Sequence, residues 1–366
     1  MTAITQQLTD AGVSIWLDDL DRSRITTGNL AELIATLNVR GVTTNPSIFE
    51  KAITSGSDAY AAQLATLKGA NVDDVVLALT TEDVRNACDI FAPLAKSSDG
   101  IDGHVSIEVD PRLAHDTQGT IEAARKLWRT VDRANVLIKI PATKEGLPAI
   151  STVLGEGISV NVTLIFSVDR YREVLEAWMS GLEAAHAAGH DISRIHSVAS
   201  FFVSRVDVAV DPRLDTIGTP EALALQGKAA IANARQAWAA FGETAASQRV
   251  AQLRAKGAHV QRPLWASTGV KDPKFDPTMY VMQLVGDPCV NTMPEATLNA
   301  VRDQGQFAGN TLDGTLADAN AVWRSLAAIG IDQAEVCEQL ETEGVAKFME
   351  AWQTLLDNVA RTLDAS

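Results

Sequence analysis

A single lysine lies in the middle of an otherwise apolar segment, Val136-Leu137-Ile138-Lys139-Ile140-Pro141. A short segment rich in β-branched residues is typical of a strand that is buried on both faces. Burying an ammonium group costs several kcal/mol unless the group is paired or loses its proton. The neutral amine is the form that attacks a carbonyl carbon. Lys139 is therefore either a nucleophile, or a structural lysine whose charge reaches solvent or an ion-pair partner.

Other polar side chains lie near the carboxyl ends of neighbouring apolar segments. Because successive side chains of a strand point to opposite faces, Ser106 and Glu108 lie opposite Ile107 and Val109. Seven consecutive segments carry such a polar group, and in the seventh the alternation places Trp265 on the polar face. The polar side chains assigned to this common face are Asp18, Asn45, Glu108, Lys139, Asn161, Thr163, Ser200 and Ser267.

Short apolar segments alternate with stretches of helical period, which predicts βαβ units and a parallel sheet. The apolar segments are Val13–Leu17, Gly41–Thr44, His104–Val109, Val136–Ile140, Ile158–Phe166, Ile195–Val203, Val260–Ala266 and, more weakly, Cys289–Met293. The helical stretches include Asn29–Leu37, Thr120–Val131, Val168–Ala188 and Pro220–Phe241. Eight apolar segments favour a closed (β/α)8 TIM barrel over an open sheet, and no G-x-G-x-x-G motif follows the first segment.

The chain is expected to form one barrel domain over residues 1–366. Two long connections, at about 46–103 and 211–257, contain helical sequence but no strands of their own, so we interpret them as helical insertions. Residues from about 300 to 366 form a tail of helical pattern. In a parallel barrel the carboxyl ends of the strands share one mouth, and barrel enzymes carry out their chemistry there.

This set of side chains suits carbonyl chemistry. A neutral Lys139 would attack a ketone and form an iminium ion, which draws electrons and allows the Cα–Cβ bond of a β-hydroxy ketone to break. Asp18 and Glu108 supply two carboxylates for separate acid–base steps. The side chains of Asn45 and Asn161, together with Ser200, would bind the hydroxyl and carbonyl groups of a sugar.

Composition excludes several other classes of protein. The formal net charge of −15 argues against a nucleic-acid partner, which requires a basic surface. No apolar stretch approaches the roughly 18 residues of a membrane span, and the first residues show no signal-peptide pattern. The 3 cysteines form no CxxC pair and fit a reducing compartment. We therefore predict a cytoplasmic protein without a membrane partner.

Five strings of the sequence resemble the strand motifs of the transaldolase family, in the order in which the family has them. These strings are Gly41-Val42-Thr43-Thr44-Asn45-Pro46-Ser47, Ile107-Glu108-Val109-Asp110, Val136 to Gly146, Asn161-Val162-Thr163-Leu164-Ile165-Phe166 and Ser200-Phe201-Phe202-Val203-Ser204-Arg205. The length and the long insertions resemble the longer bacterial members. The resemblance implies a (β/α)8 barrel without cofactor or metal. It also implies sugar phosphates as partners: a dihydroxyacetone unit passes from sedoheptulose 7-phosphate to glyceraldehyde 3-phosphate, giving erythrose 4-phosphate and fructose 6-phosphate in the non-oxidative pentose phosphate pathway.

The resemblance also implies individual roles. Lys139 matches the Schiff-base lysine, and Asp18 matches the aspartate that handles the proton of the substrate hydroxyl. Glu108 and Thr163 match the pair that holds the catalytic water. The binding residues implied are Asn45 and Asn161 for the dihydroxyacetone unit, Ser200 and Phe202 for the pocket wall, and Arg205 for the phosphate.

One segment departs from the family pattern. Many transaldolases have a second phosphate-binding cation two residues after the serine that corresponds to Ser267, but this chain has Gly269 at that position. Lys271 follows two residues later, and we expect it to reach the phosphate beside Arg205 and Ser267. The alternative is that Lys271 is a solvated lysine of an exposed loop.

Two other functions compete with transaldolase. A Schiff-base aldolase would release free dihydroxyacetone by the same lysine chemistry, and a sugar-phosphate-binding barrel would bind without turnover. The binding protein is disfavoured because it has no need of a desolvated lysine beside Asp18 and Glu108. The expected assembly is a monomer or a homodimer.

Overall fold

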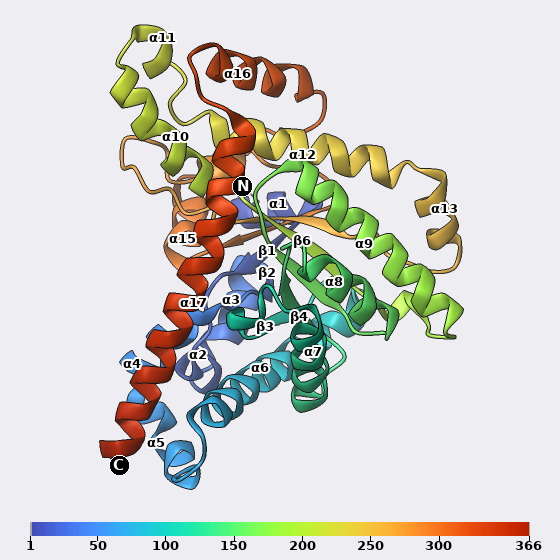
Figure 1. Cartoon of the computed structure of the whole chain (residues 1–366), viewed down its shortest axis with the longest axis vertical. Coiled ribbons are helices and arrows are strands. Elements are labelled where there is room, and N and C mark those ends of the chain that lie inside the picture. The colour runs from blue at the N-terminus through green and yellow to red at the C-terminus, as the bar shows by residue number, and fades with distance from the viewer. Residues whose placement is uncertain (1, 366) are drawn as a thin grey trace.

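The computed structural model describes residues 2–365 and contains a closed barrel of parallel strands in the order β1 to β8 (Figure 1). The strands are β1 Val13–Leu17, β2 Val39–Val42, β3 His104–Glu108, β4 Val136–Pro141, β5 Val160–Ile165, β6 Ser197–Phe202, β7 Arg262–Ala266 and β8 Cys289–Met293. The predicted (β/α)8 barrel is confirmed, including its weakest strand, β8.

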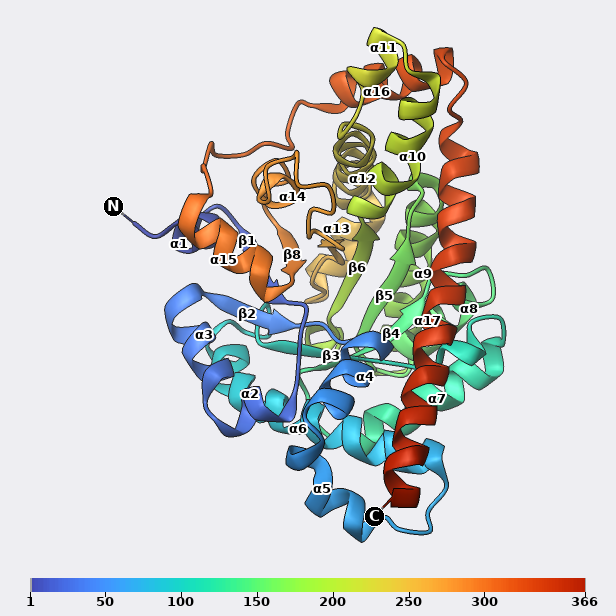
Figure 2. The ribbon, with the colours of Figure 1, turned by 90° about the vertical axis from the view of Figure 1, so that its left-hand side faces the viewer.

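Helices surround the barrel of strands (Figures 1 and 2). They are α1 Ile4–Asp10, α2 Arg22–Thr26, α3 Asn29–Leu37, α4 Pro46–Ser55, α5 Ser57–Thr66, α6 Val72–Ser97, α7 Thr117–Val131, α8 Gly146–Gly155, α9 Val168–Ala187, α10 Ser204–Ile217, α11 Pro220–Leu223, α12 Ala229–Ala245, α13 Gln248–Ala255, α14 Met279–Met282, α15 Glu295–Gln304, α16 Leu316–Ala328 and α17 Gln333–Ala365. Two short 3-10 helices are η1 Pro111–Leu113 and η2 Ile192–Arg194.

Two predicted elements differ from the structure in their bounds. Strand β2 begins and ends two residues earlier than the predicted Gly41–Thr44, because the chain turns at Asn45 to start α4. The predicted helix Pro220–Phe241 is interrupted between α11 and α12. Gly227 has φ +68° there, a left-handed conformation that glycine adopts without strain, and its N–H donates to the carboxylate of Asp211 at 3.0 Å.

The strand register places three functional candidates side by side on the inner face. Glu108 of β3 pairs with Lys139 of β4, and Lys139 pairs with Asn161 of β5. In a parallel sheet, paired residues point to the same face. Side chains that are tens of residues apart in the sequence therefore become direct neighbours.

An apolar layer fills the barrel beneath these side chains. Its members are buried residues of β1, β4, β6, β7 and β8: Trp16, Leu137, Val198, Leu264, Ala266 and Val290. The indole of Trp16 requires a residue without a side chain at position 41, because a Cβ atom on Gly41 would lie 2.6 Å from the ring. This layer forms a dry floor, so the polar groups above it cannot be solvated from below.

The prediction that Trp265 shares the inner face with Ser267 is wrong. Leu264 and Ala266 belong to the inner layer, whereas Trp265 packs in the outer core, edge-on against Phe201 with ring centroids 6.2 Å apart. Strand β7 ends at Ala266, and Ser267 has φ +56°, so the alternation of strand side chains does not continue to it. Ser267 still lies at the mouth, because the backbone turns there after the end of β7.

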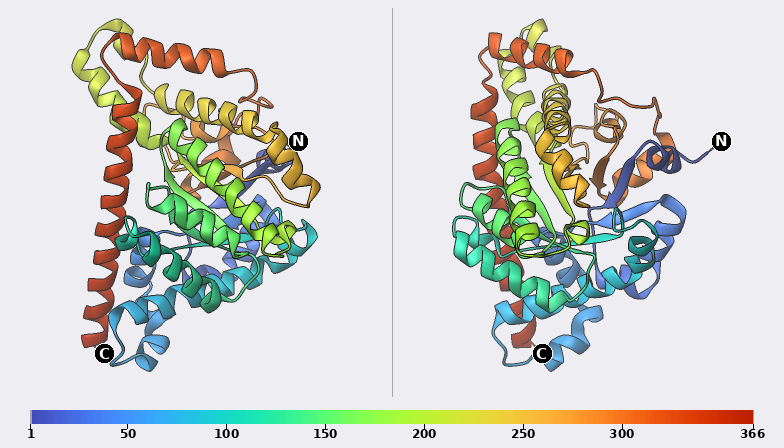
Figure 3. Two further views of the ribbon diagram at one scale, coloured as in Figure 1. Left: turned by 45° about the vertical axis from the view of Figure 1, so that its right-hand side comes forward. Right: turned by 90° about the vertical axis from the view of Figure 1, so that its right-hand side faces the viewer.

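The long helix α17 runs along most of the height of the molecule, past the carboxyl ends of the strands (Figures 2 and 3). Near its start the Cys337 thiol contacts the Phe166 carbonyl oxygen at 3.3 Å, beyond the end of β5. Near its end Asn358 donates to Glu50 of α4 at 2.8 Å. The predicted helical tail thus spans the mouth and is fixed on both sides of it.

The opposite end of the barrel contains a stack of histidines. The rings of His104 and His196 lie 4.9 Å apart between centroids, and those of His196 and His259 lie 4.8 Å apart. His104 Nε2 lies 2.6 Å from the Gly100 carbonyl oxygen, so the neutral ring donates from this nitrogen. Burial lowers the pKa of His104 to about 4 and that of His196 to about 2, and nearby Arg262 also disfavours their protonation.

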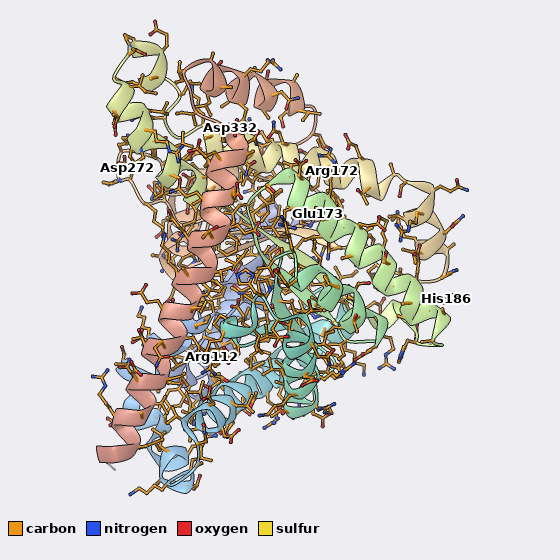
Figure 4. All side chains as sticks on the ribbon, in the orientation of Figure 1. Arg112, Arg172, Glu173, His186, Asp272 and Asp332 are labelled. Carbon is orange, nitrogen blue, oxygen red and sulfur yellow. The ribbon has the colours of Figure 1, made fainter. Side chains whose placement is uncertain are left out.

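These histidines predict a loss of stability in mild acid. Both folded-state pKa values lie below the unfolded value of about 6.5, so the stabilisation is complete above that pH and is lost as the pH falls toward 4. Over this pH range the free energy of unfolding of His104→Gln should fall less than that of the parent protein, by on the order of 3 kcal/mol. Denaturant unfolding across this range measures it, with His186→Gln, at the outer end of α9 (Figure 4), as the matched control. A His104→Gln curve parallel to the parent curve would contradict the prediction.

Candidate active site at the barrel mouth

Lys139 is the central group of the mouth. Its side chain points to the inner face of β4, and the residue is only 4% exposed. Its Nζ donates to the carbonyl oxygen of Thr44 at 2.8 Å and to Glu108 Oε2 at 3.3 Å. The amine is therefore fixed above the apolar floor by two acceptors and remains close to a carboxylate that can exchange protons with it.

Glu108 is buried to the same degree as its partner, with side-chain exposures of 5% for each. Burial raises the pKa of Glu108 to about 7, although the charge and the hydrogen bond of Lys139 oppose the shift. A carboxyl group with a pKa near neutral pH both accepts and donates a proton readily. Glu108 is thus a base for the Lys139 ammonium and an acid for a later step.

Asp18 follows β1 directly and provides the second carboxylate. Thr43 Oγ1 donates to Asp18 Oδ1 at 2.6 Å, and the Thr43 and Thr292 hydroxyls are also 2.6 Å apart. Burial raises the pKa of Asp18, while the hydrogen bond from Thr43 and the charge of Lys139 act in the opposite direction. Asp19, the next residue, pairs with Arg24 at 2.7 Å.

A hydrogen-bond chain orients the amide of Asn161 next to Lys139. Asn161 Nδ2 donates to Ser106 Oγ at 3.0 Å, and Ser200 Oγ donates to Asn161 Oδ1 at 2.7 Å. Asn45 has a structural task as well, because its side-chain oxygen accepts the Ile48 N–H at 3.0 Å and caps α4. The Asn45 amide N–H groups are not used by this cap and are free for a substrate.

Thr163 lies two residues beyond Asn161 and is fully buried. Within residues 2–365 its hydroxyl has no hydrogen-bond partner. The backbone leaves the regular strand immediately afterwards, since Leu164 has φ +60° and the β5–β6 register shifts there. A buried hydroxyl without a protein partner is suited to hold a water molecule.

Basic side chains without ion-pair partners lie at the rim of the mouth. Arg205, in the first turn of α10, is half-buried and forms no hydrogen bond or ion pair with the residues that the structure describes. The preceding Ser204 hydroxyl lies 3.0 Å from that of Ser267, so the β6 and β7 ends meet here. Phe202 packs its ring 5.1 Å from that of Phe166 on the same side of the mouth.

The Lys271 amine lies close to Gly269. A Cβ atom on Gly269 would lie 3.7 Å from Lys271 Nζ, which is an ordinary van der Waals contact. Lys271 is exposed, and its positive charge acts to lower the pKa of Asp18, which burial raises. The loop after β7 therefore brings the Lys271 amine next to Gly269, two residues after Ser267.

Several residues of the site were not singled out from the sequence. The Thr44 carbonyl oxygen and the Thr292 hydroxyl contact Lys139 and Thr43, respectively. Phe348 of α17 lies with its ring centroid 5.8 Å from Lys139 Nζ. Thr43 lies two residues before Asn45, so the alternation of strand side chains places both on one face, whereas the sequence contains no signal for the position of Phe348. Among residues 2–365 no group of three or more acidic, histidine or cysteine side chains is arranged to hold a metal ion.

The parallel barrel has a buried lysine at its mouth, Lys139, which pairs with the Glu108 carboxylate and lies near the Asp18 carboxylate. This arrangement defines the class of enzymes that bind carbonyl compounds covalently through a lysine amine. Comparison with known proteins narrows this class. The family described as Transaldolase/Fructose-6-phosphate aldolase matches residues 15–359. The chain belongs to this family, as its strand motifs predicted.

Relatives named Transaldolase match almost end to end. One from Mycolicibacterium smegmatis is 60% identical over 361 residues, covering 98% of this chain and 97% of the relative. One from Mycobacterium bovis is 58% identical over 362 residues with the same coverage of both chains, and one from Mycobacterium ulcerans is 59% identical over 361 residues, covering 98% and 96%. The similarity to these relatives thus extends over 98% of this chain.

Proposed function

We propose that this chain transfers a dihydroxyacetone unit from a ketose phosphate to an aldose phosphate through a Schiff base on Lys139. The observation that carries the proposal is the 3.3 Å contact between Lys139 Nζ and Glu108 at the barrel mouth. Sedoheptulose 7-phosphate and glyceraldehyde 3-phosphate are the expected donor and acceptor. The family description also includes an aldolase, but the relatives at 58–60% identity are named for the transferase activity.

The first steps form the covalent intermediate. Glu108 takes a proton from the Lys139 ammonium, and the amine attacks the ketone carbon of the donor. The carbinolamine then loses its hydroxyl as water, with a proton supplied by Glu108, and a C=N bond replaces the C=O bond. Thr163, whose buried hydroxyl lacks a protein partner, holds this water together with Glu108.

The second stage breaks and remakes a carbon–carbon bond. Asp18 takes the proton of the hydroxyl on the β-carbon, the Cα–Cβ bond breaks so that this carbon becomes the aldehyde, and the electrons of the broken bond move to the iminium nitrogen. An aldose phosphate leaves, and a three-carbon enamine stays on Lys139. The enamine carbon attacks the aldehyde of the acceptor, Asp18 returns its proton to the new hydroxyl, and water hydrolyses the product iminium.

The remaining site residues bind the substrate. Asn161 and Ser200, oriented by their mutual hydrogen bond, contact the hydroxyl and carbonyl groups of the three-carbon unit together with Asn45. Phe202 forms an apolar wall. Arg205, Ser267 and Lys271 bind the phosphate in this proposal. Arg205 forms no hydrogen bond or salt bridge with the described residues, although its charge lowers the pKa of Glu343, and Lys271 Nζ lies close to Gly269 at the end of the same loop as Ser267.

The described residues 2–365 include no helix that is long and apolar enough to cross a membrane. A cytoplasmic location and a monomeric or homodimeric assembly stay predictions. Sedimentation of the purified protein at several concentrations tests the assembly.

Lys139→Met should abolish covalent trapping of the substrate. With fructose 6-phosphate and borohydride the parent protein should gain the mass of one reduced three-carbon dihydroxyacetone unit on Lys139, because the aldose phosphate leaves, and the variant should gain none. The turnover number should fall by roughly four orders of magnitude because the nucleophile is absent. Lys126→Met is the matched control, since this exposed lysine pairs only at the surface with Asp74 at 3.5 Å. Trapping on another lysine would overturn the proposed function.

Lys271→Ala should raise the Michaelis constant for phosphorylated substrates by about tenfold, because one charge-assisted contact is lost. The turnover number should change little. Lys274→Ala is the control in the same loop, as Lys274 pairs with Asp272 at 3.0 Å; Figure 4 labels Asp272 in this loop. Steady-state kinetics with fructose 6-phosphate measure both constants. An unchanged Michaelis constant in Lys271→Ala would make Lys271 an ordinary solvated lysine.

A further inference from the structure

The tail helix contributes a side chain directly above the reactive amine. The ring centroid of Phe348 lies 5.8 Å from Lys139 Nζ, on the side of the lysine that the barrel strands leave open. Phe348 is half-buried and packs against the core at its edge. The catalytic steps proposed above do not involve this ring, although an aromatic side chain at such a distance contacts any group attached to Lys139 Nζ.

The position of Phe348 is fixed by its neighbours on α17. One turn earlier, a Cβ atom on Gly344 would lie 3.1 Å from Leu164 Cδ2 and 3.3 Å from the Phe166 ring. The missing side chain therefore lets the helix lie directly on the end of β5. One turn later, Trp352 lines a cavity of about 190 Å³ that reaches Asn45 and Glu108 and is bounded also by side chains of α6 and α7. Gly344, Phe348 and Trp352 follow one another at intervals of four residues, so they share one face of α17, and this face meets the end of β5 and Lys139.

We infer that Phe348 is a wall of the reaction site that shields the lysine-bound three-carbon unit from water, so that an aldehyde and not a proton takes its nucleophilic carbon. The inference rests on the proposed function and deepens it. It identifies a residue that decides between transfer and simple cleavage, which the lysine chemistry itself does not decide.

The two fates of the intermediate differ only in the electrophile. In transfer, the enamine carbon forms a bond to the aldehyde carbon of the acceptor, and the aldehyde oxygen takes the proton held by Asp18. In release, the enamine carbon takes a proton delivered from water, and the resulting iminium is hydrolysed to dihydroxyacetone and the free Lys139 amine. Water near the enamine favours only the second route, so an apolar cover over Lys139 favours the first.

The ring type supports this role. Phe348 has no hydroxyl or amine, so it offers no proton to the enamine carbon. The face of a phenyl ring also attracts a cation within about 6 Å, which favours the iminium that precedes bond cleavage. Together with the inner layer below Lys139, the ring encloses the reactive nitrogen between two apolar surfaces.

The test compares two rates on the full-length protein. Fructose 6-phosphate alone gives the rate of dihydroxyacetone release, and fructose 6-phosphate with erythrose 4-phosphate gives the rate of transfer. The variants are Phe348→Ala and Phe348→Leu, and the matched control is Met349→Ala, the next residue of the helix, which is 42% exposed. Thermal unfolding of each variant accompanies the assays, and Phe348→Leu retains apolar volume if the alanine variant is unstable.

Phe348→Ala should raise the ratio of release to transfer by about tenfold, and Phe348→Leu should raise it less, because water reaches the enamine. Met349→Ala should keep the parent ratio. A ratio in both Phe348 variants equal to that of the parent would overturn the inference, whether the two rates stay unchanged or fall together. Failure of the proposed function is a separate result, since the parent protein would then show neither transfer nor a borohydride-trapped Lys139.

Discussion

The buried contact between Lys139 and Glu108 is the interaction on which the rest of the site depends. Each group alone would be a charge in an apolar barrel, and such a charge costs several kcal/mol. The pairing of β3 with β4 places the two side chains in adjacent positions, and the Thr44 carbonyl oxygen provides the second acceptor for the amine. Burial raises the pKa of Glu108 to about 7, so one proton can move between Glu108 and Lys139 without a change in geometry.

The surrounding structure shields the pair of Lys139 and Glu108 and forms the proposed substrate site. An apolar layer closes the barrel below it, and α17 covers it from above with Phe348. The polar groups proposed to bind the sugar lie between these two surfaces, whereas Arg205 and Lys271, which are proposed to bind the phosphate, lie at the more exposed rim. The charge required for binding is thus separated from the low-dielectric region required for the amine.

Much of this arrangement could be predicted because it depends on two local rules. The alternation of strand side chains placed Asp18, Glu108 and Asn161 on one face, and the count of apolar segments indicated the closed barrel. The same rule failed at the end of β7, where it misplaced Trp265. Ser267 adopts a left-handed conformation there, and no neighbouring residue type predicts it. Phe348 could not be predicted either, because its role depends on where a distant helix packs, and that is decided by close approaches such as the one at Gly344.

The most direct test of the account is the pH dependence of Schiff-base formation in the parent protein and in Glu108→Gln. Rapid mixing with fructose 6-phosphate, followed by borohydride quenching, measures the rate at which Lys139 becomes labelled. The parent rate should rise as the pH increases through about 7, where Glu108 becomes ionised. In Glu108→Gln that rise should be absent and the rate roughly 100-fold lower. A Glu108→Gln protein with the parent rate and the parent pH profile would contradict the central role of the pair.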